Sequence, residues 1–371
     1  MPPLRIVYVL TSLGVGGAER QVAALASSMS RRGHTVLFLV LRPRMAEELA
    51  TDLPVIHLNL RKNPVSLIAA VFRARRVLLD PRPDLVHSHS FHANVFARLL
   101  RLTGAASRVL STVHNVYEGG RLRMFAYRIT DGLSLYTTAV SHAAAHRFIE
   151  LKAVPQRKIS VLANAIDLSE FTPDHVRRAE TRTRMSAGGN FIWLAAGRLS
   201  PAKDYPTLLR AFAQLRASNP SARLWIAGQG TSGELAALEA AAASLNLTDQ
   251  VSWLGLRRDL PALLDAADAF VLSSAWEGMP LVVAEAMAME KPVVATDVGG
   301  VGELVAETGA IVPPQSAASL AEAMQTVMQQ SVDLRRAQGH AARLRIQQHF
   351  NLERRSDEWE AFYQSLLKRN R

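Results

Sequence analysis

Short apolar runs rich in β-branched residues alternate with helix-like patterns along most of the chain, and this alternation restricts the fold more than any other feature. Residues 18–31 illustrate the helical pattern, because Val22, Leu25, Ala26 and Met29 recur at the spacing of one helix face. Strands that alternate with helices form parallel sheets covered on both faces, so the sequence predicts an α/β fold with doubly wound sheets. The predicted strands form two series, residues 5–10, 35–41, 85–88, 108–113, 136–140 and 159–162, then residues 191–196, 223–227, 251–254, 269–272 and 292–296.

A polar, turn-rich stretch, Thr172–Asn190, separates the two series and ends near the pair Gly188-Gly189. A length of 371 residues suits two domains. We therefore predict two Rossmann-like domains that face a central cleft. Their predicted bounds are residues 1–172 and 173–351, and the C-terminal helix, residues 352–371, is expected to pack back on the first domain. Ligands of open parallel sheets bind beyond the carboxyl ends of strands, so the residues that follow each strand are the candidate site residues.

The chain contains no cysteine, which excludes disulfides, thiolate metal sites, iron–sulfur clusters and a cysteine nucleophile. No apolar run approaches the ~18 residues of a membrane span. The apolar run at residues 6–10 is too short for the core of a signal peptide. We therefore expect a cytoplasmic protein.

Positive charge is concentrated in the first half of the chain. Residues 1–185 carry 26 Lys/Arg and 13 Asp/Glu, whereas residues 186–371 carry 17 and 19. Residues 61–82 form a basic amphipathic pattern that favours either peripheral binding to anionic lipid on the inner membrane face, or a helix whose apolar stripe faces its own sheet. Nucleic acid is not an expected partner, because aromatic and basic residues are not interleaved and no binding module is present.

The first predicted strand runs into a glycine-rich turn, Gly14-Val15-Gly16-Gly17. Glycines at this place let a phosphate approach backbone N–H groups at a helix N-terminus, although a tight turn without a ligand has the same sequence. The pattern departs from the dinucleotide fingerprint, because Glu19 stands at the third glycine position and no acidic residue ends the strand at 35–41. This departure disfavours a nicotinamide-dependent oxidoreductase.

The second series opens in the same way. The strand at residues 191–196 leads into Gly197-Arg198, and Lys203 follows just before the next helical pattern. Two cations at the end of a strand suit the binding of a diphosphate, whose charge they would neutralise as it departs. Surface side chains that are merely solvated are the alternative.

The segment 274–288 is the most specific part of the sequence. A Gly278-Met279-Pro280 turn follows the strand at 269–272, and Pro280 suits the first turn of a helix. Glu277 precedes that helix, and Glu285 lies within it among apolar neighbours, where a charge requires a partner or a ligand. The N–H groups at the start of the helix suit hydroxyls or phosphate. A structural acid near a helix N-terminus is the alternative for Glu285.

Together these motifs resemble the retaining family-4 (group 1) glycosyltransferases of the GT-B fold, over nearly the whole chain. The signature is Glu277-x7-Glu285 with Glu277-Gly278-Met279-Pro280 inside it. The other matching motifs follow in order: Gly16-Gly17-Ala18-Glu19, the segment 84–89, Asn164-Ala165-Ile166-Asp167 with Phe171, Gly197-Arg198-Leu199 with Lys203, Ala227-Gly228-Gln229-Gly230, and Asp297-Val298-Gly299-Gly300 with Glu303. Ala165 replaces the glycine that is usual in the third of these.

The resemblance implies a role for each matching residue. Arg198 and Lys203 would bind the donor pyrophosphate together with the backbone of Gly16 and Gly17, and Glu285 would hold the ribose. The sugar would be held by Glu277 and by Gly278, Met279, Pro280 and Leu281, and would lie near His114. Leu256 and Arg257 fall where the family contacts the nucleobase. The catalytic group would comprise Glu277, Arg198, Lys203 and His114.

The resemblance also implies a function: transfer of a sugar from a nucleotide-diphosphate sugar to a glycan or lipid-linked acceptor in cell-surface polysaccharide or glycolipid synthesis. Retention of the anomeric configuration is expected, by same-face attack without a covalent intermediate. No cofactor or metal is expected, since Asp-x-Asp, which holds a metal diphosphate in the other main glycosyltransferase fold, does not occur in the chain. A nucleotide-sugar epimerase of the same fold, or a non-catalytic membrane- or polymer-binding protein, remains the alternative.

Overall fold

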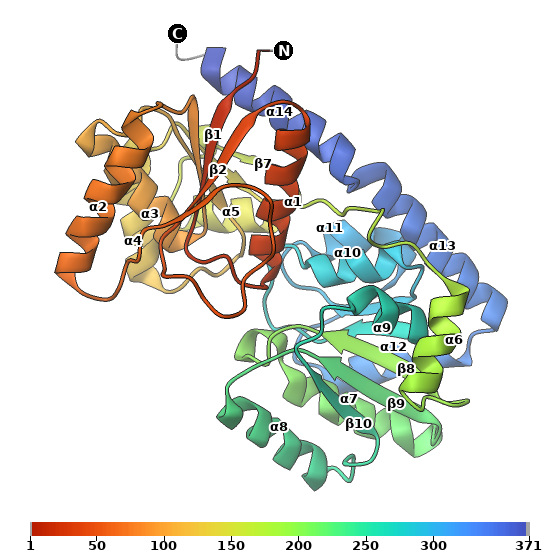
Figure 1. Cartoon of the computed structure of the whole chain (residues 1–371). Helices are drawn as coiled ribbons and strands as arrows, with labels where there is room; N and C mark the ends of the chain where they lie inside the picture. The colour runs from red at the N-terminus through yellow and green to blue at the C-terminus, as the bar shows by residue number, and fades with distance from the viewer. Residues whose placement is uncertain (1, 369–371) are drawn as a thin grey trace. The chain divides into compact units, whose positions relative to one another are not determined.

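A computed structural model describes residues 2–368 and confirms the predicted α/β class (Figure 1). The chain forms two compact units: unit 1 runs to Ala165 and includes the C-terminal segment from Leu352, and unit 2 runs from Ile166 to Asn351. Residues 369–371, which the sequence analysis placed in the last helix, lie outside the described residues. None of the helices within residues 2–368 is long and apolar enough to cross a membrane.

The boundary between the units lies seven residues before the predicted one at 172. Hydrogen bonding explains the difference. The amide of Ile166 donates to the carbonyl of Phe350 at 2.8 Å, and the guanidinium of Arg343 donates to the carbonyl of Phe171 at 2.8 Å. Residues 166–171 are therefore held by the end of unit 2 rather than by unit 1.

Unit 1 contains a sheet of seven parallel strands in the order β3-β2-β1-β4-β5-β6-β7. Alternate residues of β1 face opposite layers: Ile6 and Tyr8 pack against α1 and α14, and Val7 and Val9 against α2 and α3. The strands are β1 (Arg5–Leu10), β2 (Thr35–Val40), β3 (Val55–His57), β4 (Leu85–His89), β5 (Val109–Val113), β6 (Tyr136–Ala139) and β7 (Ile159–Val161). The helices are α1 (Gly17–Arg31), α2 (Pro64–Leu79), α3 (Phe91–Leu100), η1 (Arg101–Thr103), α4 (Arg121–Thr130), η2 (Asp131–Leu133), α5 (His142–Glu150), η3 (Gln156–Lys158) and α14 (Leu352–Lys368).

Unit 2 contains a sheet of six parallel strands in the order β10-β9-β8-β11-β12-β13. The strands are β8 (Phe191–Ala196), β9 (Ala222–Ala227), β10 (Val251–Gly255), β11 (Ala269–Leu272), β12 (Val293–Thr296) and β13 (Ala310–Val312). The helices are α6 (His175–Arg184), η4 (Pro201–Lys203), α7 (Tyr205–Ser218), α8 (Ser232–Ser244), α9 (Leu260–Ala266), α10 (Leu281–Ala288), α11 (Val301–Val305), η5 (Ala306–Thr308), α12 (Ala317–Gln329) and α13 (Val332–His349). In both sheets the strand order reverses direction once, between β1 and β4 and between β8 and β11.

The polar stretch predicted as a break is largely helix α6, which packs on α9. The helix contains few apolar residues, and arginine side chains hold it in place instead. Arg178 pairs with Asp268 at 2.6 Å, and Arg182 pairs with the same carboxylate at 3.1 Å. Asp268 also accepts the amide of Ile192 at 2.8 Å, so one carboxylate joins α6 to the start of β8.

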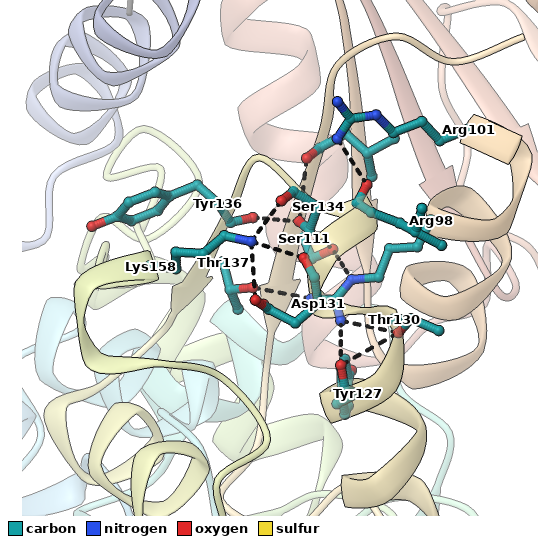
Figure 2. Close-up of polar contacts among 12 residues, drawn as sticks. Arg98, Arg101, Ser111, Tyr127, Thr130, Asp131, Ser134, Tyr136, Thr137 and Lys158 are labelled. Atoms are coloured by element: carbon teal, nitrogen blue, oxygen red, sulfur yellow. Dashed lines mark hydrogen bonds and ion pairs between the residues drawn. The ribbon is translucent and has the colours of Figure 1, made fainter. Parts of the chain in front are cut away.

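A buried arginine on α3 organises the polar interior of unit 1 (Figure 2). Arg98 is fully buried and donates to the hydroxyls of Ser111 at 3.1 Å and Thr137 at 3.0 Å and to the carbonyl of Tyr127 at 3.1 Å. Burial lowers the pKa of the guanidinium, but from a starting value so high that it stays charged. Arg98 therefore ties α3 to β5, β6 and α4.

Candidate active site

In unit 2, the predicted donor residues gather at the carboxyl ends of β8 and β11, where the strand order reverses. Arg198 and Lys203 follow β8, and Glu277 follows β11. Reversal of strand order leaves a crevice beyond the strand ends in open α/β sheets, which is where such folds bind ligands. The structure thus brings these three predicted residues to one end of one sheet.

The two charges closest to each other at this site are those of Lys203 and Glu277. The Nζ atom of Lys203 lies 2.5 Å from Oε1 of Glu277, and both side chains are largely buried. The hydroxyl of Ser274 donates to the same oxygen at 2.7 Å, and the hydroxyl of Ser273 donates to the carbonyl of Lys203 at 2.8 Å. The lysine is therefore held in a fixed position before any ligand binds.

Arg198 differs from Lys203, because its side chain is exposed and makes no hydrogen bond or ion pair with another described residue. It lies near the start of α8, where Thr231 caps the helix through a reciprocal pair of hydrogen bonds with Glu234. Hydrogen bonds that the amide and the hydroxyl of Thr231 donate to the Glu234 carboxylate and, to a smaller degree, the charge of Arg198 lower the pKa of that carboxyl. Arg198 is thus a cation available to an anion from solution.

Glycines allow the loops of this site to approach one another. Gly197 has φ +152°, and a Cβ on it would lie 2.7 Å from Cε of Lys203. A Cβ on Gly228 would lie 1.8 Å from the carbonyl oxygen of Gly197, and one on Gly299 would lie 2.1 Å from that of Glu277. Gly228 and Gly299 are therefore required by close backbone contacts at this end of the sheet, and Gly197 by its positive φ.

The segment after Glu277 forms the turn and helix that the sequence predicted. Pro280 precedes the first residue of α10, and Glu285 lies on that helix with only 1% of its surface exposed. Most of the turn and the helix start is also buried, including Met279 and Leu281. A buried carboxylate on a short apolar helix at the strand ends suits a ligand that offers hydroxyl donors.

Leu256 and Arg257 follow β10, at the same end of the sheet. Leu256 is 36% exposed, whereas Arg257 is held by Asp259 through two hydrogen bonds of 2.8 and 2.6 Å. This bidentate pairing raises the pKa of Arg257 and lowers the pKa of Asp259. The guanidinium of Arg257 is therefore occupied by Asp259, whereas the side chain of Leu256 is partly exposed.

In unit 1, Gly16 precedes α1 and Gly17 begins it. The carboxylate of Glu19 folds over this loop: it accepts the hydroxyl of Ser12 at 3.2 Å, and a Cβ on Gly16 would lie 2.4 Å from its Oε2. Glu19, the residue that departs from the dinucleotide fingerprint, therefore packs its carboxylate against the glycine loop.

His114 follows β5 and belongs to a cluster of histidines. Its Nε2 lies 3.0 Å from Nδ1 of His89, the last residue of β4, and the His89 ring lies 4.0 Å from that of His87. Burial lowers the pKa of His114 to about 4 and holds those of His87 and His89 well below the usual value, so all three rings are neutral at pH 7. His114 can thus exchange hydrogen bonds with a hydroxyl but cannot serve as a cation.

Sequence reasoning missed the partners that fix His114. Its amide donates to Glu118 at 3.0 Å, and the other oxygen of Glu118 accepts the hydroxyl of Tyr127 at 2.6 Å. Burial, the largest influence, raises the pKa of Glu118. Nδ1 of His114 and Nε2 of His89 are buried without a hydrogen-bond partner in the described part of the chain. The alternation of His87 and His89 along one strand was the only sequence signal for this cluster.

Among residues 2–368, no group of three or more His, Asp or Glu side chains is arranged to hold a metal ion. The groups that the structure offers at the end of the unit 2 sheet are the exposed cation of Arg198, the cation of Lys203 paired with Glu277, and the buried carboxylate of Glu285. Such a set can bind an anion that also carries hydroxyls, and can stabilise negative charge that develops on it.

Comparison with known proteins agrees with this chemistry. Residues 177–345 match the family model of glycosyl transferases group 1, and residues 15–170 match that of glycosyltransferase family 4. An Escherichia coli UDP-Gal:alpha-D-GlcNAc-diphosphoundecaprenol alpha-1,3-galactosyltransferase is 27% identical over 66% of this chain and 64% of its own length, just under two thirds. A glycogen synthase of Mycobacterium tuberculosis is 28% identical over 91% of this chain and 88% of its own.

The fold is that of the GT-B glycosyltransferases. The crystal structure of Anabaena Alr3699/HepE in complex with UDP and glucose superposes with a TM-score of 0.86 over 98% of this chain and 100% of that one, at 21% identity. At this identity the likeness shows the shared fold.

Proposed function

The chain belongs to the group 1, family 4 glycosyltransferases, and from this membership we propose that it moves a sugar from a nucleotide-diphosphate sugar to a glycan or lipid-linked acceptor. The observation that carries the proposal is the set Arg198, Lys203 and Glu277 at the strand reversal of unit 2, with Glu285 buried on α10 beside it. We assign Arg198 and Lys203 to the pyrophosphate and Glu285 to the ribose. Glu277, with Gly278, Met279, Pro280 and Leu281, is assigned to the sugar.

The chemistry follows from charge. As the bond between the anomeric carbon and the diphosphate oxygen breaks, its electron pair passes to that oxygen. Arg198 and Lys203 stabilise the developing charge in the transition state more than in the ground state. The acceptor hydroxyl attacks the same face of the sugar and loses its proton to the departing phosphate oxygen, so the configuration is retained. Neither a covalent nucleophile nor a metal ion is part of this scheme.

Three further assignments complete the proposed donor site. The backbone of Gly16 and Gly17 contributes N–H groups to the pyrophosphate. The exposed side chain of Leu256 and the backbone at Arg257 contact the base, since the guanidinium of Arg257 is bound to Asp259. His114, neutral at pH 7, hydrogen bonds a hydroxyl of the transferred sugar.

We infer that the acceptor is lipid-linked. The E. coli relative is named for a diphosphoundecaprenol acceptor, and the first half of this chain is basic, which suits an acceptor that carries diphosphate. A role in cell-surface polysaccharide or glycolipid synthesis would follow from such an acceptor.

A panel of nucleotide sugars tested by thermal shift identifies the donor, because a ligand that binds the folded state raises Tm according to its affinity. The true donor should shift wild-type protein, and Arg198→Ala should abolish that shift. Arg336→Ala, on a side chain 77% exposed on α13, is the matched control and should leave the shift unchanged. Turnover should fall about 100-fold or more in Arg198→Ala and persist in EDTA.

Product analysis separates the alternatives. Conversion of the donor alone into another nucleotide sugar would indicate an epimerase, whereas product that forms only with acceptor indicates transfer. No shift with any nucleotide sugar, or turnover that stops in EDTA and returns with a divalent metal, would overturn the proposed scheme.

A further inference from the structure

Two helices of unit 1 present apolar stripes to solvent. On α2 the stripe is Val65, Ile68 and Phe72, which are 77%, 58% and 68% exposed. On α4 the corresponding residues are 86%, 58% and 63% exposed: Leu122, Phe125 and Ile129. Both stripes have the spacing i, i+3, i+7, which aligns side chains along one face of a helix.

These stripes are not the faces with which the helices pack. α2 contacts its sheet through Ala70, Ala74 and Leu78, and α4 buries Met124 and Tyr127. At 3.6 residues per turn the exposed stripes lie on the opposite side of each helix from the buried ones. The expectation that the apolar stripe of residues 61–82 faces its own sheet therefore holds for Leu78 but not for the exposed stripe of Val65, Ile68 and Phe72.

The two helices that carry the stripes are connected through η1. Arg75 on α2 donates to the carbonyl of Thr103 at 2.6 Å, next to Leu102, which is 69% exposed. Arg101, in the same short helix η1, donates to the carbonyl of Leu133 just beyond α4. Helix α3 packs on α4 between these contacts. In Figure 1 these helices lie along one side of the unit 1 sheet, away from α1 and α14.

The surface is positively charged and contains no carboxylate of its own. No Asp or Glu occurs in residues 53–79, 85–117 or 119–130. Arg76, Arg121 and Arg128 are exposed on the two helices and make no hydrogen bond or ion pair with the rest of the described chain. In contrast, Arg73 and Arg75 are bound to backbone carbonyls and are less free to meet a ligand.

We propose that this surface, formed by α2, η1 and α4, docks the protein on an anionic lipid bilayer. The apolar side chains would enter the acyl boundary, and the free arginines would pair with anionic headgroups, as in helices that lie in a membrane interface. Charge complementarity selects this partner over a second copy of the chain, because self-association through this face would bring two arginine-rich surfaces together without a carboxylate to pair them. The inference does not depend on the proposed sugar transfer.

Vesicle flotation tests the docking. Full-length protein is mixed with vesicles of phosphatidylcholine alone or with vesicles that also contain about 30% phosphatidylglycerol, an anionic lipid. Wild-type protein should float with the anionic vesicles and only weakly with the neutral ones. Leu122→Ser/Phe125→Ser should lower the partition coefficient about tenfold or more. Arg76→Gln/Arg121→Gln/Arg128→Gln should lower it about fivefold for each arginine near the surface.

The matched control is Val332→Ser/Leu334→Ser on α13, where the two side chains are 52% and 48% exposed in unit 2. It should float like wild type. All variants should keep the wild-type Tm, since every substituted side chain is exposed. The proposal would be overturned if wild type did not float, or if wild type and the α4 variant floated equally. It would also be overturned if sedimentation velocity showed a dimer that the α4 substitutions abolish.

Discussion

Lys203 and Glu277 form an ion pair of 2.5 Å across 74 residues of sequence, at the point where the strand order of unit 2 reverses. The pair joins a cation assigned to the pyrophosphate with a carboxylate assigned to the sugar. Before a donor binds, each charge therefore stabilises the other, and the serine hydroxyl of residue 274 fixes the carboxylate further. Binding of a diphosphate would offer the lysine a second anion without moving it.

The first prediction concerns this pair. Lys203→Met should destabilise the protein by about 2–4 kcal/mol, because it leaves the Glu277 carboxylate largely buried without its cation. Glu277→Gln should cost a similar amount for the reverse reason. The double variant should be more stable than the sum of the two effects by about 1–3 kcal/mol, measured by urea unfolding. Strict additivity would mean that the pair contributes nothing to the fold.

The second prediction concerns the glycine contact at β8 and β9. Gly228→Ala should lower stability by about 3 kcal/mol or more and should weaken donor binding, because its Cβ would overlap the carbonyl of Gly197. Gly233→Ala is the control: nothing lies within 4 Å of its Cβ, and it is in α8, where alanine should add about 0.5–1 kcal/mol. Thermal unfolding of both variants, with donor titration of each, provides the measurement. Equal stability of the two would contradict the contact.

The third prediction concerns pH. His114 has a pKa of about 4 in the folded protein and about 6.5 when unfolded, so between these values the unfolded state binds more protons. Its contribution to stability is complete above pH 6.5 and falls as the pH falls toward 4. The loss between pH 7 and pH 5 should be about 2 kcal/mol for this group.

His89 and His87, whose pKa values are also depressed by burial, add to the same trend. Hydrogen exchange of the β4 and β5 amides reports the stability of unit 1 at each pH. In His114→Gln the difference between pH 7 and pH 5 should shrink by about the stated amount. If the variant keeps the full wild-type pH dependence, His114 is not the group responsible.

The fourth prediction concerns α6. Asp268→Ala should destabilise unit 2 by about 2–4 kcal/mol, because it removes the carboxylate shared by Arg178, Arg182 and the amide of Ile192. Asp333→Ala removes a carboxylate that is 95% exposed and should change stability by less than about 0.5 kcal/mol. Proteolysis within residues 172–190 should accelerate only in the first variant. Comparable protection in both would show that α6 is held by other contacts.

Local sequence patterns were enough to predict much of the fold. β1, β8 and β11 lie where the sequence predicted them, because their apolar runs are buried on both faces and need no information from distant residues. The edge strands β3 and β13, each of three residues, were missed, whereas β7, an edge strand of the same length, was predicted. Helix α6 was predicted as a break because its attachment is ionic and it has no apolar stripe.

The sequence also predicted some features of the candidate site and missed others. The motifs around Arg198, Glu277 and Glu285 were recognisable from residue type and spacing, because their positions at strand ends follow from the α/β pattern. The ion pair of Lys203 with Glu277, the commitment of Arg257 to Asp259 and the contact of His89 with His114 were not recognisable. Each of these depends on the direction and burial of side chains.

The sequence by itself therefore determined the α/β class, the family and the strand ends to which we assign the donor site, since these depend on periodicity and on short motifs. Only the tertiary structure decided which charges are already paired, which imidazoles are neutral and which apolar stripes remain outside. Val65 and Leu78 illustrate the reason: they lie on one amphipathic helix, but only the packing of α2 on its sheet buries one and exposes the other.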